Sequence, residues 1–257
     1  MPWINEYVAE NYRTELFNYL DSHNLSVPKT EVNPTVAEVL PADECEYHLT
    51  GTDTITAAIA VHEENPDARI AVLNFASYKT PGGAFMRNAL AQEEYLCYCT
   101  NLYREILQFK DTWYKQHLKT LRSGLYTNQS LLSHDITVVA SEPGKLLPEE
   151  EQFTVDVLTC AAPNWSPALK YSTLTRDELV TATRERIKYV MRLLSTYGYD
   201  NIIVGAYGCG VFKNDPTVVV QAFLKAMGMY KLKHVTFAVP DKTSDNYIAF
   251  KNELVGR

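Results

Sequence analysis

Apolar, often β-branched runs alternate with helix-like patterns from residue 45 onward, and this alternation limits the possible folds more than any other feature of the chain. Such alternation is typical of a sheet whose strands are connected through helices on both of its faces. The sequence therefore predicts an α/β fold with a largely parallel central sheet. The expected strands are Glu46–Thr50, Arg69–Phe75, Ile136–Ala140, Phe153–Cys160, Asn201–Ala206 and His234–Val239.

Three helices are expected between these strands. The first starts near Thr54 and spans about ten residues, with Thr52 as its cap. The second runs from Ala91 to His117, because apolar residues recur there at helical spacing: Tyr95, Leu102, Ile106, Phe109 and Trp113. The third covers Thr175–Tyr197, and Gly198 ends it. We expect the apolar stripe of the second helix to lie in the core.

The N-terminal part of the chain has a different pattern. Residues 1–40 predict an N-terminal helical extension, with a helix over Glu6–His23 and a connector rich in Pro and Thr over Val27–Pro41. The remaining residues, 41–257, are long enough to form a single large α/β domain. The sequence thus predicts one compact domain preceded by a helical extension.

Charge and hydropathy exclude two classes of partner. The net charge of −7 argues against general binding to nucleic acid backbones, which relies on a basic face. No apolar run approaches the roughly 18 residues that a membrane span requires. The first residues also lack the basic and then apolar order of a secretory signal. We therefore expect a cytoplasmic protein without a membrane partner.

The cysteines give no sign of a metal site. The chain has five of them, an odd number, and no CxxC pair. This usage fits reduced thiols better than a disulfide framework or a zinc site. We expect no bound metal and no cofactor, so an anionic ligand has to be met by backbone N–H groups and a few cations.

The first segment with chemical content is NFASYKTPGGAFMRNALAQEEYL, from Asn74 to Leu96. An apolar strand ends there in a loop with Gly82 and Gly83, and the loop leads to a helix that starts near Glu93 and Glu94. Acids in a first helical turn are commonly there to complement the helix dipole, at about 0.3–1 kcal/mol each. They also lie where the start of a helix could meet a ligand.

A second glycine-rich loop follows the strand near residue 204, in NIIVGAYGCGVFKNDP. Its glycines allow a close approach of the backbone to a ligand and turn N–H groups inward, as in loops that hold a diphosphate. Asp215 and Pro216 suit the cap and first turn of the next helix. The spacing matches neither common phosphate-binding motif, so this loop alone leaves anion binding and a simple tight turn both open.

Taken together, NFAS, PGG, QEE and GAYGCGVFKNDP resemble the bacterial and fungal type of poly(ADP-ribose) glycohydrolase over roughly residues 45–240. The resemblance implies a three-layer α/β/α, macrodomain-like fold with a mixed, largely parallel central sheet, and makes residues 41–257 the catalytic domain. It also implies binding of ADP-ribose and cleavage of the ribose–ribose bond of poly(ADP-ribose).

The same resemblance assigns roles to individual residues. Glu94 matches the catalytic acid, and Glu93 matches its neighbour that binds the hydroxyls of the terminal ribose. Residues implied to contact the ligand are Asn74, Ser77, Gly82, Gly83, Ala84, Gln92, Gly208, Cys209, Gly210, Val211 and Phe212. One position departs from the family pattern, because Ala84 replaces a third glycine and would be strained at a positive φ.

The chemistry of one acid suits this reaction. Cleavage of a ribosyl bond needs a proton on the departing hydroxyl oxygen and later the removal of a proton from water, and Glu94 can do both. Two alternatives stay open: a module that binds ADP-ribose without cleaving it, and a hydrolase that acts on mono-ADP-ribosylated protein or nucleic acid. The expected partners are accordingly ADP-ribose, poly(ADP-ribose) or ADP-ribosylated macromolecules. The oligomeric state and the residue that stacks on the adenine are not specified by the sequence.

Overall fold

The computed structural model describes residues 6–23, 25, 29–36, 44–120 and 122–255. Within these ranges seven strands form the central sheet, in the order β1-β4-β7-β3-β8-β9-β2. The strands are β1 (Lys29–Val32), β2 (Glu46–Thr50), β3 (Ile70–Phe75), β4 (Ser130–Val138), β7 (Phe153–Cys160), β8 (Asn201–Gly205) and β9 (His234–Ala238). A small separate hairpin consists of β5 (Ala140–Glu142) and β6 (Lys145–Leu146).

Strand direction determines where the loops meet. The neighbours β7, β3, β8, β9 and β2 are parallel, whereas β4 is antiparallel to β7 and β1 is antiparallel to β4. The five parallel strands therefore end at the same edge of the sheet. In the doubly wound α/β architecture this edge is where ligands bind.

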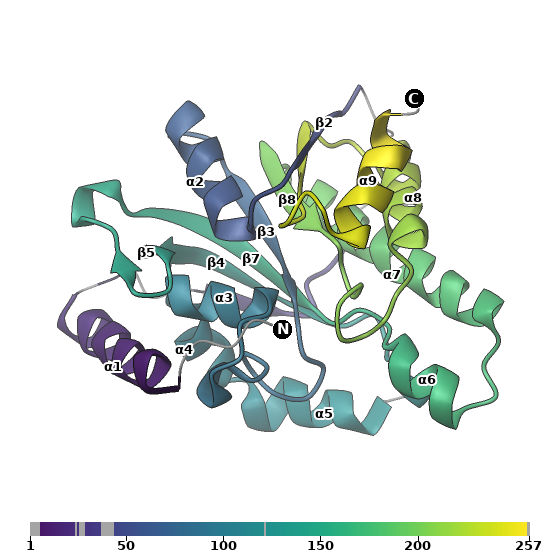
Figure 1. The fold of residues 1–257 in the computed structure, drawn as a ribbon, viewed down its shortest axis with the longest axis horizontal. Helices are drawn as coiled ribbons and strands as arrows, with labels where there is room; N and C mark the ends of the chain where they lie inside the picture. The colour runs from purple at the N-terminus through teal and green to yellow at the C-terminus, as the bar shows by residue number, and fades with distance from the viewer. Residues whose placement is uncertain (1–5, 24, 26–28, 37–43, 121, 256–257) are drawn as a thin grey trace.

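Helices cover both faces of the sheet, so the molecule has the three-layer α/β/α architecture that the sequence predicts (Figure 1). One apolar cluster joins the sheet to α1 (Glu6–Ser22), α2 (Thr54–Glu64), α3 (Gln92–Cys99) and α4 (Leu102–Leu107). A second joins the opposite face to α7 (Arg176–Tyr197), α8 (Pro216–Met227) and α9 (Asp245–Val255). The remaining helices, α5 (Lys115–His117) and α6 (Trp165–Tyr171), are short.

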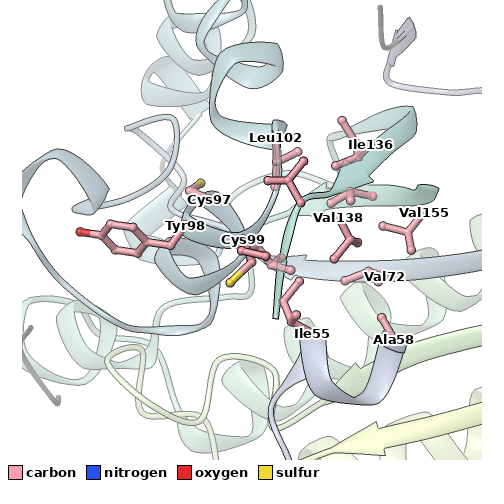
Figure 2. Packing of buried hydrophobic residues seen from close by; sticks show 14 of the residues in the cluster. Ile55, Ala58, Val72, Cys97, Tyr98, Cys99, Leu102, Ile136, Val138 and Val155 are labelled. Atoms are coloured by element: carbon pink, nitrogen blue, oxygen red, sulfur yellow. The ribbon is translucent and has the colours of Figure 1, made fainter. Parts of the chain in front are cut away.

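The central strands are buried on both faces, which explains their continuous apolar sequences. In β3, Ile70 and Val72 pack on the first cluster, whereas Ala71 and Leu73 pack on the second. Figure 2 shows part of the first cluster, where side chains of α2 and α3 gather around those of β3, β4 and β7. Alternate residues of one strand thus hold the two helical layers against the sheet.

Most predicted elements are confirmed, several with the expected bounds. The strands over residues 46–50 and 153–160 are reproduced, and α7 has Thr175 as its N-cap and Gly198 in the left-handed conformation at its end. Asp215 and Pro216 open α8 as expected. β4 starts earlier than predicted, at Ser130, because a register shift between Ser133 and Ile136 interrupts its alternation.

The long helix predicted from Ala91 to His117 is wrong. The chain forms α3 and α4 as separate helices, then a π-helical segment over Lys110–Tyr114 and the short α5. The break lies at Thr100, whose backbone is extended (φ −142°, ψ 173°) and bridges to Val138 of β4. The cap of α2 also differs, since Asp53 rather than Thr52 accepts the first N–H groups.

The N-terminal segment is more than a helical extension. α1 confirms the expected helix, but the predicted connector Val27–Pro41 contains β1, a strand of the central sheet that pairs with β4. Its four residues are too short for alternation to reveal it. The domain boundary expected between residues 40 and 41 lies outside the described residues. Among the helices that the structure describes, none has the length and apolar character of a membrane span.

A polar network fastens β1 to the sheet. His134 of β4 makes hydrogen bonds through one ring nitrogen to Asp156 of β7 (2.7 Å) and through the other to Glu31 of β1 (2.9 Å). Burial by itself lowers the pKa of His134, but the hydrogen bonds and charges of the two carboxylates outweigh it and raise this pKa above 6.5. Hydrogen bonds from Tyr197 and His134 lower the pKa of Glu31 below 4.5.

The network predicts a pH window for its contribution to stability. A raised histidine pKa stabilises fully below 6.5, and a lowered carboxyl pKa stabilises fully above 4.5. The loss in unfolding free energy caused by His134→Gln should therefore be largest between these values and shrink as the pH rises or falls beyond them. Urea unfolding at several pH values measures it. A loss that is the same from pH 4 to pH 9 would contradict this account.

Candidate active site

A cavity of about 500 Å³ opens at the carboxyl edge of the parallel strands. Its walls include the residues that follow β3, β7, β8 and β9, together with the first turns of α2 and α3. Most of the residues expected in the site line it: Ser77, Gly83, Ala84, Gln92, Glu93, Glu94, Gly208, Gly210, Val211 and Phe212. Asn74, Gly82 and Cys209 lie outside this lining, in the same segments. The topology thus brings the two glycine-rich loops together.

Glycine is required at two positions of the first loop. Gly82 and Gly83 have φ values of 65° and 59°, in the left-handed region. A Cβ on Gly82 would lie 2.7 Å from the Tyr103 ring, and one on Gly83 would meet carboxyl oxygens of both Glu93 and Glu94. The two carboxyl groups therefore converge on Gly83, although their residues are neighbours in a helix.

Position 84 does not require a glycine. Its φ is −109° and its ψ is 24°, a conformation that an L-residue adopts without the steric cost of a positive φ. The departure from the family pattern at this position is therefore absorbed by the backbone.

Glu94 is buried, and both of its carboxyl oxygens are held by backbone groups. Oε1 accepts the N–H of Ala84 (2.7 Å), and Oε2 accepts the N–H of Ala91 (3.1 Å). The second bond caps the start of α3, so Glu94 has the local structural role expected of a first-turn acid. The first bond connects the helix to the glycine loop. The orientation of the carboxyl group is thereby fixed from two sides.

Glu93 is held by a different set of donors. Its Oε2 accepts the N–H of Ser77 (2.7 Å), and its Oε1 accepts the side-chain amide of Asn74 (3.4 Å). Burial raises the pKa of Glu93 well above 4.5, against the lowering effect of the Ser77 N–H, and the nearby charge of Glu94 raises it further. Asn74 is fully buried and thus supports the carboxyl group of Glu93 from within the protein.

Gln92 lines the cavity, yet its amide is used by the protein. Its Oε1 accepts the N–H of Phe75 (2.8 Å), and its Nε2 donates to the carbonyl of Leu73 (2.9 Å) and to Thr54 (3.2 Å). The side chain therefore extends the hydrogen bonding of β3 and ties α3 to that strand. This geometry supports a role for Gln92 in positioning α3.

The second loop is anchored at its base and open at its tip. Gly208 has a φ of 75° and packs against Asn214 and Ala162. Asn214 donates to the carbonyls of Pro163 (2.7 Å) and Gly208 (3.2 Å), which fixes the base of the loop. Gly210 at the tip faces open space, with no atom within 4 Å of an added Cβ.

The tip of this loop has backbone N–H groups that could bind an anion. No acceptor among the described residues meets the N–H groups of Gly210, Val211 or Phe212. The Phe212 carbonyl accepts the N–H of Trp165 (2.9 Å), so the end of the loop is tied to the start of α6. Successive N–H groups without an acceptor at a cavity wall are donors available to an anion. Burial raises the pKa of the Cys209 thiol, which makes it a poor nucleophile at neutral pH.

Sequence reasoning missed the remaining walls of the cavity. These are formed by the first residues of α2, by Tyr95, and by Pro240, Ser244 and Asn246 after β9. The signal available was topological, because the loop after a parallel strand faces the same edge as the two glycine loops. Within the described part of the chain no group of three His, Cys, Asp or Glu side chains is placed to hold a metal ion.

The chain is similar to known proteins of one kind. A family model described as "Microbial-type PARG, catalytic domain" matches residues 6–141, beginning well before the segment on which the motif resemblance rests. A crystal structure of the poly(ADP-ribose) glycohydrolase (PARG) of Thermomonospora curvata, bound to the inhibitor ADP-HPD, is 30% identical, with 81% of this chain and 79% of that chain covered and a TM-score of 0.69.

A second solved structure is similar over nearly the whole chain. It is the PARG of Deinococcus radiodurans in complex with ADP-ribose, 28% identical, with 99% of this chain and 94% of that chain covered and a TM-score of 0.73. No curated protein matches the chain.

The conformation of the glycine loop predicts a larger loss of stability at position 83 than at position 84. Gly83→Ala should lower the free energy of unfolding by at least about 1–2 kcal/mol, the cost of a side chain at positive φ, because the new methyl also displaces the two carboxyl groups. Ala84→Gly should cost no more than about 0.4–1 kcal/mol, through the entropy of the unfolded chain. Urea unfolding measures both changes.

Gly210→Ala is the matched control, since Gly210 has neither a positive φ nor a close neighbour. It should be at least as stable as the wild type, with a gain of no more than about 0.4–1 kcal/mol from the lower entropy of the unfolded chain. A Gly83→Ala protein as stable as this control would be incompatible with the loop conformation described.

Proposed function

Since the chain belongs to the microbial-type PARG family and is a glycosidase of that type, we propose that its cavity binds the terminal ADP-ribose of poly(ADP-ribose) and that Glu94 cleaves the ribose–ribose bond. The observation that carries this proposal is the convergence of two buried carboxyl groups on Gly83, at the wall of a cavity whose other loop offers free N–H groups. The released product is ADP-ribose.

Glu94 provides both proton transfers. As an acid it gives its proton to the oxygen of the departing hydroxyl while the bond from this oxygen to the anomeric carbon breaks and positive charge develops on the ribose. As a base it then takes a proton from the water that attacks this carbon. The Ala84 and Ala91 N–H groups keep the carboxyl group oriented through both steps.

Glu93 is proposed to hold the hydroxyls of the reacting ribose. Its buried carboxyl group is fixed by Ser77 and Asn74, and its raised pKa reduces the negative charge beside an anionic ligand. A carboxyl group in this state both donates and accepts hydrogen bonds, which suits a pair of hydroxyls. The two neighbouring glutamates thus have separate tasks.

The diphosphate is proposed to lie on the loop of residues 208–212. An acidic protein has little general attraction for an anion, so local donors have to hold it. The N–H groups of Gly210, Val211 and Phe212 supply such donors. Lys79 and Arg87 also line the cavity and add positive charge to its wall.

The other candidate functions receive less support. A module that only binds ADP-ribose gains nothing from two buried carboxyl groups beside an anion, because burying them costs free energy. A hydrolase for single ADP-ribose units on protein or nucleic acid would use the same acid and differs only in its leaving group, so the similarity to PARG rather than the site geometry favours the polymer. Product analysis with labelled poly(ADP-ribose) and a mono-ADP-ribosylated protein separates these functions.

Glu94→Gln tests the catalytic proposal. The substitution preserves size but removes the transferable proton, so kcat on poly(ADP-ribose) should fall about 10²- to 10⁴-fold. The affinity for ADP-ribose, measured by calorimetry, should stay close to that of the wild type, because the amide keeps the size of the carboxyl group. Glu93→Gln is the matched neighbour and should weaken binding as well as turnover. Wild-type turnover by Glu94→Gln would refute the proposed role.

Gly210→Val tests the placement of the diphosphate. The added side chain enters open space beside the free N–H groups, so it should leave the unfolding midpoint near that of the wild type. Affinity for ADP-ribose should fall about tenfold or more, since the side chain takes the place of the ligand. Unchanged affinity in the folded variant would remove this loop from the binding site.

A further inference from the structure

Arg13 is a buried charged residue outside the cavity. It belongs to α1 and is only 6% exposed. A buried guanidinium is costly unless hydrogen bonds satisfy it, so its partners indicate what it holds in place. Its Nη1 lies 3.2 Å from the Phe85 carbonyl and 3.2 Å from the Tyr98 hydroxyl, and it also donates to the side-chain oxygen of Asn88.

Two of these partners belong to the turn that follows the first glycine loop. Phe85 begins a 3₁₀ turn over Phe85–Arg87, and Asn88 ends it in the left-handed conformation (φ 63°). The N–H of Phe85 donates to the Gly82 carbonyl (2.9 Å), and that of Asn88 donates to the Phe85 carbonyl (3.2 Å). Arg13 therefore fastens the turn at both of its ends.

The same turn carries the donor that orients Glu94. The N–H of Ala84, directly before Phe85, donates to Glu94 Oε1. The Phe85 ring packs against Tyr98 at 4.6 Å between centroids, and the Arg13 guanidinium lies 5.8 Å from the centre of the Phe85 ring. Tyr98 belongs to α3, as does Glu94, and its ring points away from the strands in Figure 2. Arg13 thus contacts both segments between which the Glu94 carboxyl group is held.

We propose that Arg13 is a positioning residue for Glu94, which makes α1 a part of the catalytic unit. It acts through the Phe85–Asn88 turn and keeps the Ala84 N–H directed at the carboxyl oxygen. The inference rests on the proposed role of Glu94 as the proton donor. It assigns a function to the N-terminal segment, whose purpose the sequence does not indicate.

Arg13→Met keeps an unbranched apolar stem that can stay buried but removes the guanidinium and its hydrogen bonds. In the folded variant kcat on poly(ADP-ribose) should fall about 10- to 100-fold, the scale expected for a misplaced catalytic group. KM and the Kd for ADP-ribose should stay within about threefold, because Arg13 does not line the cavity. Arg13→Lys retains a cationic donor and should recover part of the lost kcat.

Leu16→Ala is the matched control on the same helix. Leu16 is fully buried in the apolar cluster and its side chain has no hydrogen-bonding group, so its loss lowers the unfolding midpoint without releasing a hydrogen bond to the turn. The folded control should keep the wild-type kcat. Equal losses of kcat in both variants at equal stability would overturn the proposal, as would a wild-type kcat in folded Arg13→Met.

Asn88→Gly tests the route through the turn, since glycine tolerates the positive φ but lacks the side-chain oxygen. The kcat of the double variant Arg13→Met/Asn88→Gly should be at most about twofold lower than that of Arg13→Met alone. Both substitutions remove the same hydrogen bond, so their effects should not multiply. Independent, multiplying losses would exclude this route. An inactive Glu94→Gln with a fully active Arg13→Met contradicts only this inference, whereas an active Glu94→Gln contradicts the proposed function itself.

Discussion

Two carboxyl groups buried side by side are the constraint on which the site depends. Removing a carboxylate from water is unfavourable, and a second one beside it makes the charged form less favourable still. The hydrogen bonds that hold Glu93 and Glu94 come from neutral groups: the backbone N–H groups of Ser77, Ala84 and Ala91 and the amide of Asn74. These donors come from β3, from the loop after it and from the start of α3. The local structure between residues 74 and 94 is therefore shaped by the need to bring N–H groups to two acids.

This need explains the glycine at position 83 better than a need for a flexible loop does. Gly83 has no side chain because both carboxyl groups occupy the space where a Cβ would lie, and its positive φ turns the chain so that the next N–H reaches Glu94. At Ala84 neither condition applies, so alanine is tolerated there. The turn that follows ends at Asn88 in the left-handed conformation, and contacts from outside the loop hold both of its ends. The buried Arg13, on a helix distant in sequence, makes these contacts.

Sequence patterns predicted the sheet and the residues that line most of the cavity because both depend on local, repeated signals. β-branched runs mark strands that are buried on both faces, and a glycine-rich loop after such a strand marks the ligand edge of the sheet. The break at Thr100 escaped prediction because the apolar stripe continues in phase across it and only the pairing with Val138 opposes the helix. β1 escaped because four residues show no periodicity. Arg13 escaped because a charged residue on a helix resembles a solvated one, and only tertiary packing reveals its burial.

The two loops present opposite polarities to the same cavity. The wall at α3 carries the carboxyl groups of Glu93 and Glu94, which accept the N–H groups of Ser77 and Ala84, whereas the wall at residues 210–212 offers N–H donors that no described residue engages. A ligand with hydroxyls at one part and a diphosphate at another fits this arrangement in one orientation, with the hydroxyls at the acids and the diphosphate at the free N–H groups. The reverse orientation would place phosphate oxygens against buried carboxyl groups and leave the donors unpaired, which is unfavourable at both walls. Under the proposed function, the polarity of the backbone rather than a cluster of cations would therefore select the orientation that brings the ribosyl bond to Glu94.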